Sequence, residues 1–292
     1  MPELPEVETV ANGVNERIGG ERISSVWFSR YKEPFKTDPT AMAETLTGKR
    51  IEKVYRVGKH IVVDLGTASS GAKASKSSGS TPTITVQWIV HLGMTGRLLV
   101  SAADVPVPAH THAVLGLSSG RELRFVDPRR FGRLALHGIS PDAGSSSSGH
   151  FSGPGREPLT ISPDDFVRLF KGRKLSIKAA LLNQSLLHGV GNIYADESLF
   201  RAGIRPTRMA GRLSRERLLS LHAALQEVLR KAIQLGGSSV SDYVDADGVA
   251  GFFQLEHHVY MRTGQPCLVC GAPIRRTVIG GRGTHYCPHC QR

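Results

Sequence analysis

The first three residues, Met1-Pro2-Glu3, could supply a nucleophile and a proton carrier. If Met1 is removed, Pro2 carries a free secondary amine, and an α-amino group with a pKa of about 7.7–8 is partly unprotonated at neutral pH. Such an amine can attack a sugar aldehyde carbon and form an iminium cation, which is an electron sink. Glu3 could then carry the protons that the reaction requires. An ordinary helix start, opened by proline and acids, is the alternative interpretation of these residues.

Four cysteines near the end of the chain have the spacing of a metal site. Cys267-x2-Cys270 is followed, after 16 residues, by Cys287-x2-Cys290. This spacing fits four thiolates around a tetrahedral zinc ion, and four protein ligands leave no open position for catalysis. A pair of disulfides is the alternative, but the chain has no other cysteine and the pattern favours a reducing compartment. We therefore predict one structural zinc ion, with His285 and His289 as spare ligands that it does not need.

The elements that must position these residues differ between the two halves of the chain. Val7, Val10, Ala11, Val14 and Ile18 recur at helical spacing, which predicts a helix directly behind Pro2-Glu3. Beyond that helix, residues up to 137 carry strand patterns, for example 51–57 and 60–65 with Gly58-Lys59 as the turn. They predict a two-layer β-sandwich with flanking helices.

The second half is helical. Ser162-Pro163 predicts a helix start, and the pattern predicts helices over 176–187, 193–200 and 213–235. The fold class is thus α+β with two domains. The predicted boundaries are 1–137 for the β-sandwich, 138–158 for a Ser/Gly/Pro-rich linker, 159–255 for the helical domain and 256–292 for a zinc-binding hairpin.

The amino-acid composition limits the kinds of partner that the chain is expected to bind. Among 292 residues, Lys and Arg exceed Asp and Glu by 37 − 25 = 12, which favours a polyanion and above all nucleic acid. No apolar run reaches membrane-spanning length, and the N-terminus lacks the pattern of a signal peptide. The Ser/Gly-rich stretch 66–82 predicts an enlarged, flexible hairpin loop. We expect a cytoplasmic protein without a membrane partner.

Several motifs together resemble bacterial formamidopyrimidine-DNA glycosylases, which are base-excision enzymes for oxidised purines. The motifs are the opening MPELPEVETV, Gly58-Lys59, the turn HLGMTGR at 91–97, the turn DPRRFGR at 127–133, Gly189-Val190-Gly191-Asn192 and the cysteine pattern. The resemblance spans the chain, with gaps at the two Ser/Gly-rich stretches. Asn183 departs from the acid usual in the family, and Met261 stands where glycine is common.

The resemblance implies a fold, an activity and a partner. It implies a helix–two-turn–helix in the helical domain and a β-hairpin zinc finger after it. It implies excision of the damaged base, with 8-oxoguanine and formamidopyrimidines as substrates, followed by strand cleavage through β- and δ-elimination. The expected partner is double-stranded DNA containing oxidised bases, bound by a monomer that DNA binding keeps at the bacterial nucleoid.

The resemblance also assigns roles to residues. Pro2 would be the nucleophile, Glu3 the proton carrier and Lys59 the lysine that contacts lesion and phosphate, although a turn lysine is more commonly just solvated. Met94, Arg129 and Phe131 would fill the gap left by the damaged base. His110, or its neighbour His112, Asn192 and Arg282 would contact the DNA backbone. The segment 238–254 would be a mobile lid over the everted base.

Two other functions fit part of the pattern. The endonuclease VIII-like branch of the same superfamily prefers oxidised pyrimidines, but it usually carries Glu-Gly-Pro after the proline, which is lacking here. A zinc-ribbon DNA-binding protein without catalysis would account for the basic charge and the hairpin. It would not require Pro2, Glu3 and Lys59 together.

Overall fold

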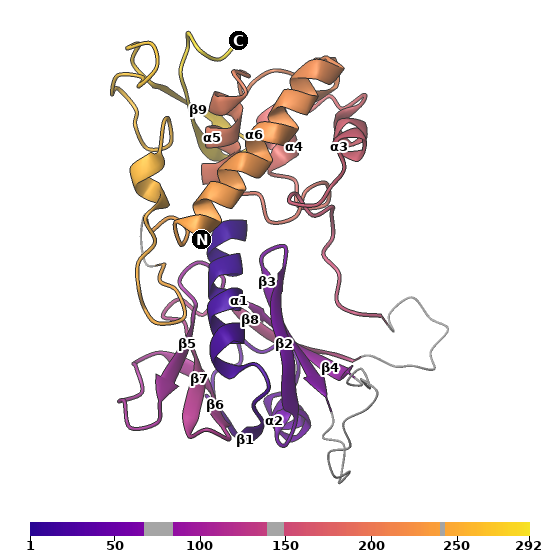
Figure 1. Cartoon of the computed structure of the whole chain (residues 1–292), viewed down its shortest axis with the longest axis vertical. Coiled ribbons are helices and arrows are strands. Elements are labelled where there is room, and N and C mark those ends of the chain that lie inside the picture. The colour runs from indigo at the N-terminus through magenta and orange to yellow at the C-terminus, as the bar shows by residue number, and fades with distance from the viewer. Residues whose placement is uncertain (67–83, 139–148, 240–242) are drawn as a thin grey trace, which may run out of the picture. The chain divides into compact units, whose positions relative to one another are not determined.

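The computed structural model describes residues 1–66, 84–138, 149–239 and 243–292, drawn in colour in Figure 1. The chain forms two compact units. Unit 1 comprises Met1–Pro2, Glu6–Ser152 and Ser241–Ala250, and unit 2 comprises Glu3–Pro5, Gly153–Val240 and Gly251–Arg292. Most of the stretch 66–82, Ser145 to Ser148 of the linker and Asp242 of the predicted lid lie outside the described residues. The four-part division expected from the sequence stays a prediction.

Unit 1 contains two four-stranded antiparallel sheets, as predicted. The first has the order β1 (Ile23–Phe28), β6 (Thr111–Leu117), β7 (Arg121–Val126), β5 (Arg97–Ala102). The second has the order β2 (Arg50–Val57), β3 (His60–Gly66), β4 (Ile84–His91), β8 (Arg133–Gly138). Alternate residues of both sheets, such as Val63 and Leu115, share one buried core. The sandwich therefore has the layers that the strand pattern predicts.

The register of the second sheet places its strand ends in two groups. His60 pairs with His91, and His91 pairs with Arg133, so the Lys59 turn and the turn after β4 leave from one end. Gly66 pairs with Ile84, and Val86 pairs with Gly138, at the other end.

The described residues of this half of the chain include two helices. The predicted N-terminal helix is α1 (Leu4–Ile18), and its apolar residues from Val7 onward are buried in the sandwich core. The second, α2 (Pro39–Leu46), was not predicted from the sequence. Its start is nevertheless encoded, because Asp38 caps it by accepting from the N–H of Ala41, and Pro39 follows at the first helical position.

Unit 2 is helical and ends in a hairpin. Its elements are α3 (Pro163–Phe170), α4 (Ile177–Leu181), α5 (Asn192–Arg201), α6 (Arg215–Gln234), β9 (Arg275–Ile279) and β10 (Arg282–Tyr286). Ser162 caps α3 through the N–H of Asp165, as its sequence predicts. Within the described part of the chain, no helix is both long and apolar enough to cross a membrane. The sheets of unit 1 and the helices and hairpin of unit 2 confirm the predicted α+β fold class.

The helix predicted over 176–187 is wrong in its second half, because α4 ends at Leu181. Side chains take over the backbone bonds of the following turn. Gln184 Nε2 donates to the carbonyls of Leu182 and Val190, and its Oε1 accepts from the N–H of Gly189. Asn183 Oδ1 likewise accepts from the N–H of Ser185. Such local bonds compete with helix formation and close the turn that precedes α5.

A second departure concerns Met261, which has a φ of 58°. This left-handed conformation suits glycine and costs other residues about 1 kcal/mol. A glycine at this position, as is common in the resembling family, would avoid that cost.

Because one amide makes three hydrogen bonds, we expect Gln184→Ala to lower the free energy of unfolding of unit 2 by about 2 kcal/mol. Urea denaturation followed by circular dichroism measures this change. The exposed Lys174 of the same unit provides the control Lys174→Ala, which should stay within about 0.5 kcal/mol of the parent. Equal effects of the two variants would contradict the assignment.

Candidate active site and metal centre

The Glu3 side chain is buried and fixed in unit 2, with 5% of its surface exposed. Its Oε1 accepts from the N–H of Ile193 at 3.3 Å, in the first turn of α5, where the helix dipole favours a negative charge. A Cβ at Gly191 would lie 2.0 Å from Glu3 Cδ, so only glycine allows this approach. The N–H of Leu4 donates to the carbonyl of Gly189 at 3.0 Å. The N-terminal acid is therefore held rigidly.

Pro2 is buried in unit 1, and in the full chain its nitrogen forms the peptide bond with the half-exposed Met1. Removal of Met1 would convert this amide into the amine that the proposed chemistry requires.

Lys59 lies in the two-residue turn between β2 and β3, behind Gly58, whose φ is +61°. Glycine is the residue that adopts this conformation without cost. The charge of Lys59 acts on His91, a residue to which the sequence analysis assigned no role. Burial, followed by the charges of His60, Arg133 and Lys59, lowers the pKa of His91 to about 4. This end of the sheet thus combines cations with an imidazole that is neutral at pH 7.

Met94, Arg129 and Phe131, which the resemblance would place in the gap left by the damaged base, are called the wedge residues. They lie on two turns that touch each other. A Cβ at Gly93 would lie 2.5 Å from the nitrogen of Gly132 and the carbonyl carbon of Phe131, so the turns meet backbone to backbone. Met94 is 41% exposed and Phe131 53% exposed. Arg129 places its guanidinium 4.7 Å from the centre of the Phe131 ring. The structure therefore brings two of the wedge residues into contact and the third onto the adjoining turn.

Asp127, which sequence reasoning missed, holds these turns together. It is fully buried, and its carboxylate accepts from Thr95 Oγ1 at 2.6 Å and from the N–H of Gly132 at 2.7 Å. Its N–H donates to the carbonyl of His110 at 3.0 Å. Its only sequence signal is the Asp-Pro that opens a turn.

The two histidines before β6 have different environments. His112 is buried, and its ring bonds to Ser29 Oγ and to the carbonyl of Asp127, each at 3.0 Å. His110 is exposed, with a φ of 64°. Of the pair, His110 is the one whose ring is accessible to a ligand.

In unit 2, Asn192 is the first residue of α5, and its Nδ2 donates to the carbonyl of Gly283 at 3.0 Å. Lys178 donates to the same carbonyl at 3.1 Å and pairs with Asp196 at 2.7 Å, and neither side chain of the pair is exposed. Burial lowers the pKa of Lys178, while Asp196 opposes the shift. Sequence reasoning missed this pair, since two charged helix residues look solvated when read alone.

The pair fixes the hairpin that carries Arg282. Asp196 Oδ2 also accepts from the backbone N–H of His285 at 2.8 Å. A side chain of α5 thus holds the backbone of β10. The turn of the hairpin is Gly280-Gly281, with φ of 56° and 73°. Arg282 follows directly and is exposed.

The four cysteines come together as their spacing predicts. Their sulfur atoms all lie within 4.8 Å of one another, with Cys270 and Cys287 3.4 Å apart and Cys267 and Cys290 3.9 Å apart. Zn–S bonds of about 2.3 Å in a tetrahedron give S···S edges of about 3.8 Å, so the donor set fits zinc.

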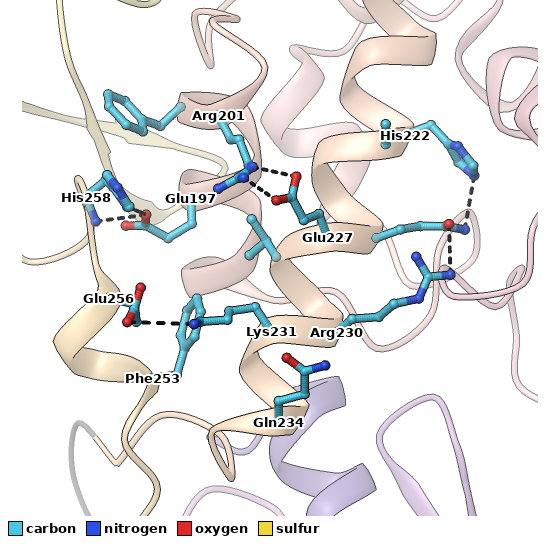
Figure 2. A pocket seen from close by; sticks show the side chains of 14 residues that line it. Glu197, Arg201, His222, Glu227, Arg230, Lys231, Gln234, Phe253, Glu256 and His258 are labelled. Atoms are coloured by element: carbon cyan, nitrogen blue, oxygen red, sulfur yellow. Dashed lines mark hydrogen bonds and ion pairs between the residues drawn. The ribbon is translucent and has the colours of Figure 1, made fainter. Parts of the chain in front are cut away.

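A cavity of about 700 Å³ lies between α5, α6 and residues 253–258 (Figure 2). Its charged side chains are largely paired. Arg201 Nε donates to Glu227 Oε2 at 2.7 Å, and Lys231 Nζ lies 4.0 Å from Glu256 Oε1. Phe253, at the end of the predicted lid 238–254, lines it, whereas none of the residues predicted individually for catalysis, DNA binding or metal binding does.

Glu197, on the wall of this cavity, fastens the chain that enters the zinc segment. Its carboxylate accepts from the N–H groups of His258, Val259 and Tyr260 at 2.8–3.0 Å. Burial opposes the shift, but these bonds and the His258 side chain lower the pKa of Glu197.

The chain thus combines a sandwich domain, a helical unit that holds the N-terminal acid Glu3, and a four-cysteine hairpin. Residues 1–134 match the formamidopyrimidine-DNA glycosylase N-terminal domain, residues 154–244 match its H2TH domain, and residues 264–292 match the zinc finger found in FPG and IleRS. The chain belongs to the formamidopyrimidine-DNA glycosylase family. It is a base-excision-repair DNA glycosylase with AP lyase activity, and its four cysteines hold a structural zinc ion.

Relatives cover the whole chain. Formamidopyrimidine-DNA glycosylases of Solibacter usitatus and Variovorax paradoxus are 44% and 41% identical, with 100% of both chains aligned. A Lactococcus lactis FPG mutant in complex with Fapy-dG DNA has a TM-score of 0.82 at 32% identity over 100% of both chains. Lactococcus lactis Fpg bound to abasic-site DNA gives the same score and identity over 99% of each chain.

The lowered pKa of His91 makes stability pH-dependent. Between pH 6.5 and about 4 the unfolded chain binds a proton that the folded chain does not, so this contribution is complete above pH 6.5 and is lost as the pH falls. We expect a loss on the order of 2 kcal/mol, after allowance for partial solvent screening.

Chemical denaturation between pH 4 and 7 measures that slope. His91→Asn keeps an acceptor for the N–H of Gly93 without a titrating ring and should flatten the curve. His110→Asn, at an exposed site, should leave the slope unchanged. A parent-like slope in His91→Asn would contradict the assignment.

Zinc removal should loosen the hairpin, because the apolar cluster around it is small. We expect Cys287→Ala, or treatment with a chelator, to release the metal and to speed hydrogen exchange of residues 275–286. Colorimetric zinc release and exchange mass spectrometry measure both effects. His289→Ala is the matched control, because four cysteines already complete the site. Hairpin amides that stay protected without metal would refute this dependence.

Proposed function

We propose that this chain excises oxidised purines, 8-oxoguanine and formamidopyrimidines, from duplex DNA through a Schiff base on Pro2. The observation that carries the proposal is the fixed position of Glu3, the residue after the proline. A chain terminus normally frays, and a carboxylate normally seeks water. Burying this acid and bonding it to the first turn of α5 is useful if it must meet a reacting atom in one geometry.

In the proposed first step, the Pro2 amine forms a bond to C1′ of the everted nucleotide. The C1′–N bond breaks, and the damaged base leaves with the electron pair and takes a proton. The Glu3 carboxylate takes the N–H proton of Pro2 and delivers it to O4′ as the sugar ring opens, which leaves an iminium between Pro2 and C1′.

The iminium then makes a C2′ proton acidic, and its removal expels the 3′ phosphate. A second elimination expels the 5′ phosphate, and water releases the sugar fragment and restores the amine. Lys59 would hold the lesion and a phosphate during these steps, since a lysine ammonium is a compact donor of hydrogen bonds to phosphate.

The two touching turns would support eversion of the base. Exposed, pliable Met94 and the Phe131 ring suit insertion into the stack. Arg129, stacked on Phe131, has the planar fork of donors that could bond the base opposite the lesion. His110, Asn192 and Arg282 would bind backbone phosphates, and 238–254 would cover the everted base.

The related structures support this substrate class and sharpen the test. Lactococcus lactis FPG has been crystallised with DNA that contains Fapy-dG, an abasic site or an oxidised pyrimidine. We infer that duplex DNA with oxidised bases is the substrate here, that a monomer binds it, and that this binding keeps the enzyme at the nucleoid of a bacterial cytoplasm.

Borohydride trapping tests the nucleophile. We expect a covalent adduct with a duplex that carries 8-oxoguanine opposite cytosine, and mass spectrometry should locate it on Pro2. A variant with an extra residue retained before Pro2 has no free proline amine and should give no adduct. Glu3→Gln keeps an acceptor for the N–H of Ile193 but cannot donate the proton, so excision should fall by about 10²–10⁴-fold.

A duplex with an oxidised pyrimidine separates the alternatives. Trapping on the pyrimidine alone would favour the endonuclease VIII-like preference. Intact DNA binding without any adduct, on protein shown to lack Met1, would leave the non-catalytic DNA-binding function.

A further inference from the structure

Helix α1 has a glycine in its middle, at Gly13, where a glycine weakens the helix. The space that it leaves is occupied from the other end of the sequence. A Cβ at Gly13 would lie 3.2 Å from Ala246 Cβ and 3.1 Å from Arg17 Nη1. Ala246 is 1% exposed and belongs to the core of unit 1. Gly13 thus forms a notch in α1 that receives Ala246.

Arg17, one helical turn further on, closes the notch. Its Nη1 donates to the carbonyl of Gly13 at 2.6 Å, and its Nε donates to Asp247 Oδ1 at 2.8 Å. Its Nη2 donates to Asp247 Oδ2, so the guanidinium binds the carboxylate with two parallel bonds. The side chain of Arg17 is 30% exposed and that of Asp247 is 44% exposed, so the ion pair alone is weak. The two parallel bonds between Arg17 and Asp247 fix the position of the segment along α1, and the buried Ala246 anchors it.

The docked segment is itself preorganised. Asp245 Oδ1 accepts from the N–H groups of Asp247 and Val249, each at 2.9 Å, and the N–H of Asp245 donates to the carbonyl of Val249 at 2.9 Å. Gly248 provides the turn with a φ of 81°.

Two further bonds extend the docking beyond the notch. The N–H of Val100, on β5, donates to the carbonyl of Ala246 at 3.1 Å. Tyr243 Oη donates to the carbonyl of Glu6 on α1 at 3.3 Å. Residues 243–249 are therefore seated on unit 1, the unit that contains Pro2 and Lys59.

We propose that Gly13 and Arg17 are positioning residues, which seat residues 243–249 on α1 so that the lid is held in place for base excision. The inference rests on the proposed function, in which 238–254 covers the everted base. A lid anchored to the helix that follows Pro2 would hold the base against the nucleophile. At an abasic site there is no base to hold, so strand cleavage there does not need the anchor.

The first test uses the protein alone. Gly13→Leu fills the notch with a good helix former, and Arg17→Gln removes the fork while keeping a polar side chain. Both should speed hydrogen exchange of residues 243–250 by about fivefold. Glu16→Gln, at an exposed site on the same helix, is the matched control. Asp247→Asn should have the same effect as Arg17→Gln, and the double variant should add little.

The second test compares two duplexes under single-turnover conditions. We expect Arg17→Gln to reduce release of 8-oxoguanine by about tenfold and to leave cleavage of a preformed abasic site within about twofold of the parent. A merely structural role for Arg17 would reduce both rates together.

The outcomes separate this inference from the proposed function. Unchanged exchange in both Gly13→Leu and Arg17→Gln overturns the anchor, and an equal loss on both duplexes overturns the positioning role. A parent protein that acts on neither duplex would refute the proposed function, whereas faster exchange in the variants would still support the anchor.

Discussion

Under the proposed mechanism the structure depends on one constraint, which is that a reactive chain terminus must also be immobile. A free amine requires that nothing precede Pro2, yet a terminus without neighbours usually moves. The chain resolves this through the residues directly after the proline. The buried carboxylate of Glu3 and the N–H of Leu4 are bonded to the Gly189–Ile193 turn, and Gly191 leaves room for the carboxylate. The Gln184 side chain, which follows the early end of α4, shapes the same turn through its three hydrogen bonds.

Buried carboxylates organise the other functional segments in the same way. Asp127 bonds the two wedge turns, Asp196 holds the hairpin of Arg282, and Glu197 fastens the chain that enters the zinc segment. The chain carries an excess of 12 positive charges, but these acids face inward and accept backbone N–H groups. Cations are then left for the surface, where a polyanion can reach them.

Local sequence signals were sufficient for most elements and for the metal site, but they missed α2 and extended α4 beyond Leu181. The Ser162 cap, the Gly58-Lys59 turn and the cysteine spacing each depend on residues close in the chain, and each was found as predicted. Asp127, His91 and the Lys178–Asp196 pair depend on contacts between distant segments, which periodicity does not encode. For the same reason the sequence identified Met94 and Phe131 only through resemblance, while the contact of their turns at Gly93 required coordinates.

The register of the β2-β3-β4-β8 sheet has a consequence for how such a chain can change over evolution. One end of the sheet carries the Lys59 turn, His91 and the wedge turns, where insertion of a residue would shift several of these groups at once. Both Ser/Gly-rich stretches are attached at the opposite end, after Gly66 and after Gly138. A change in the length of either stretch would therefore leave the register at the Lys59 end of the sheet unaltered.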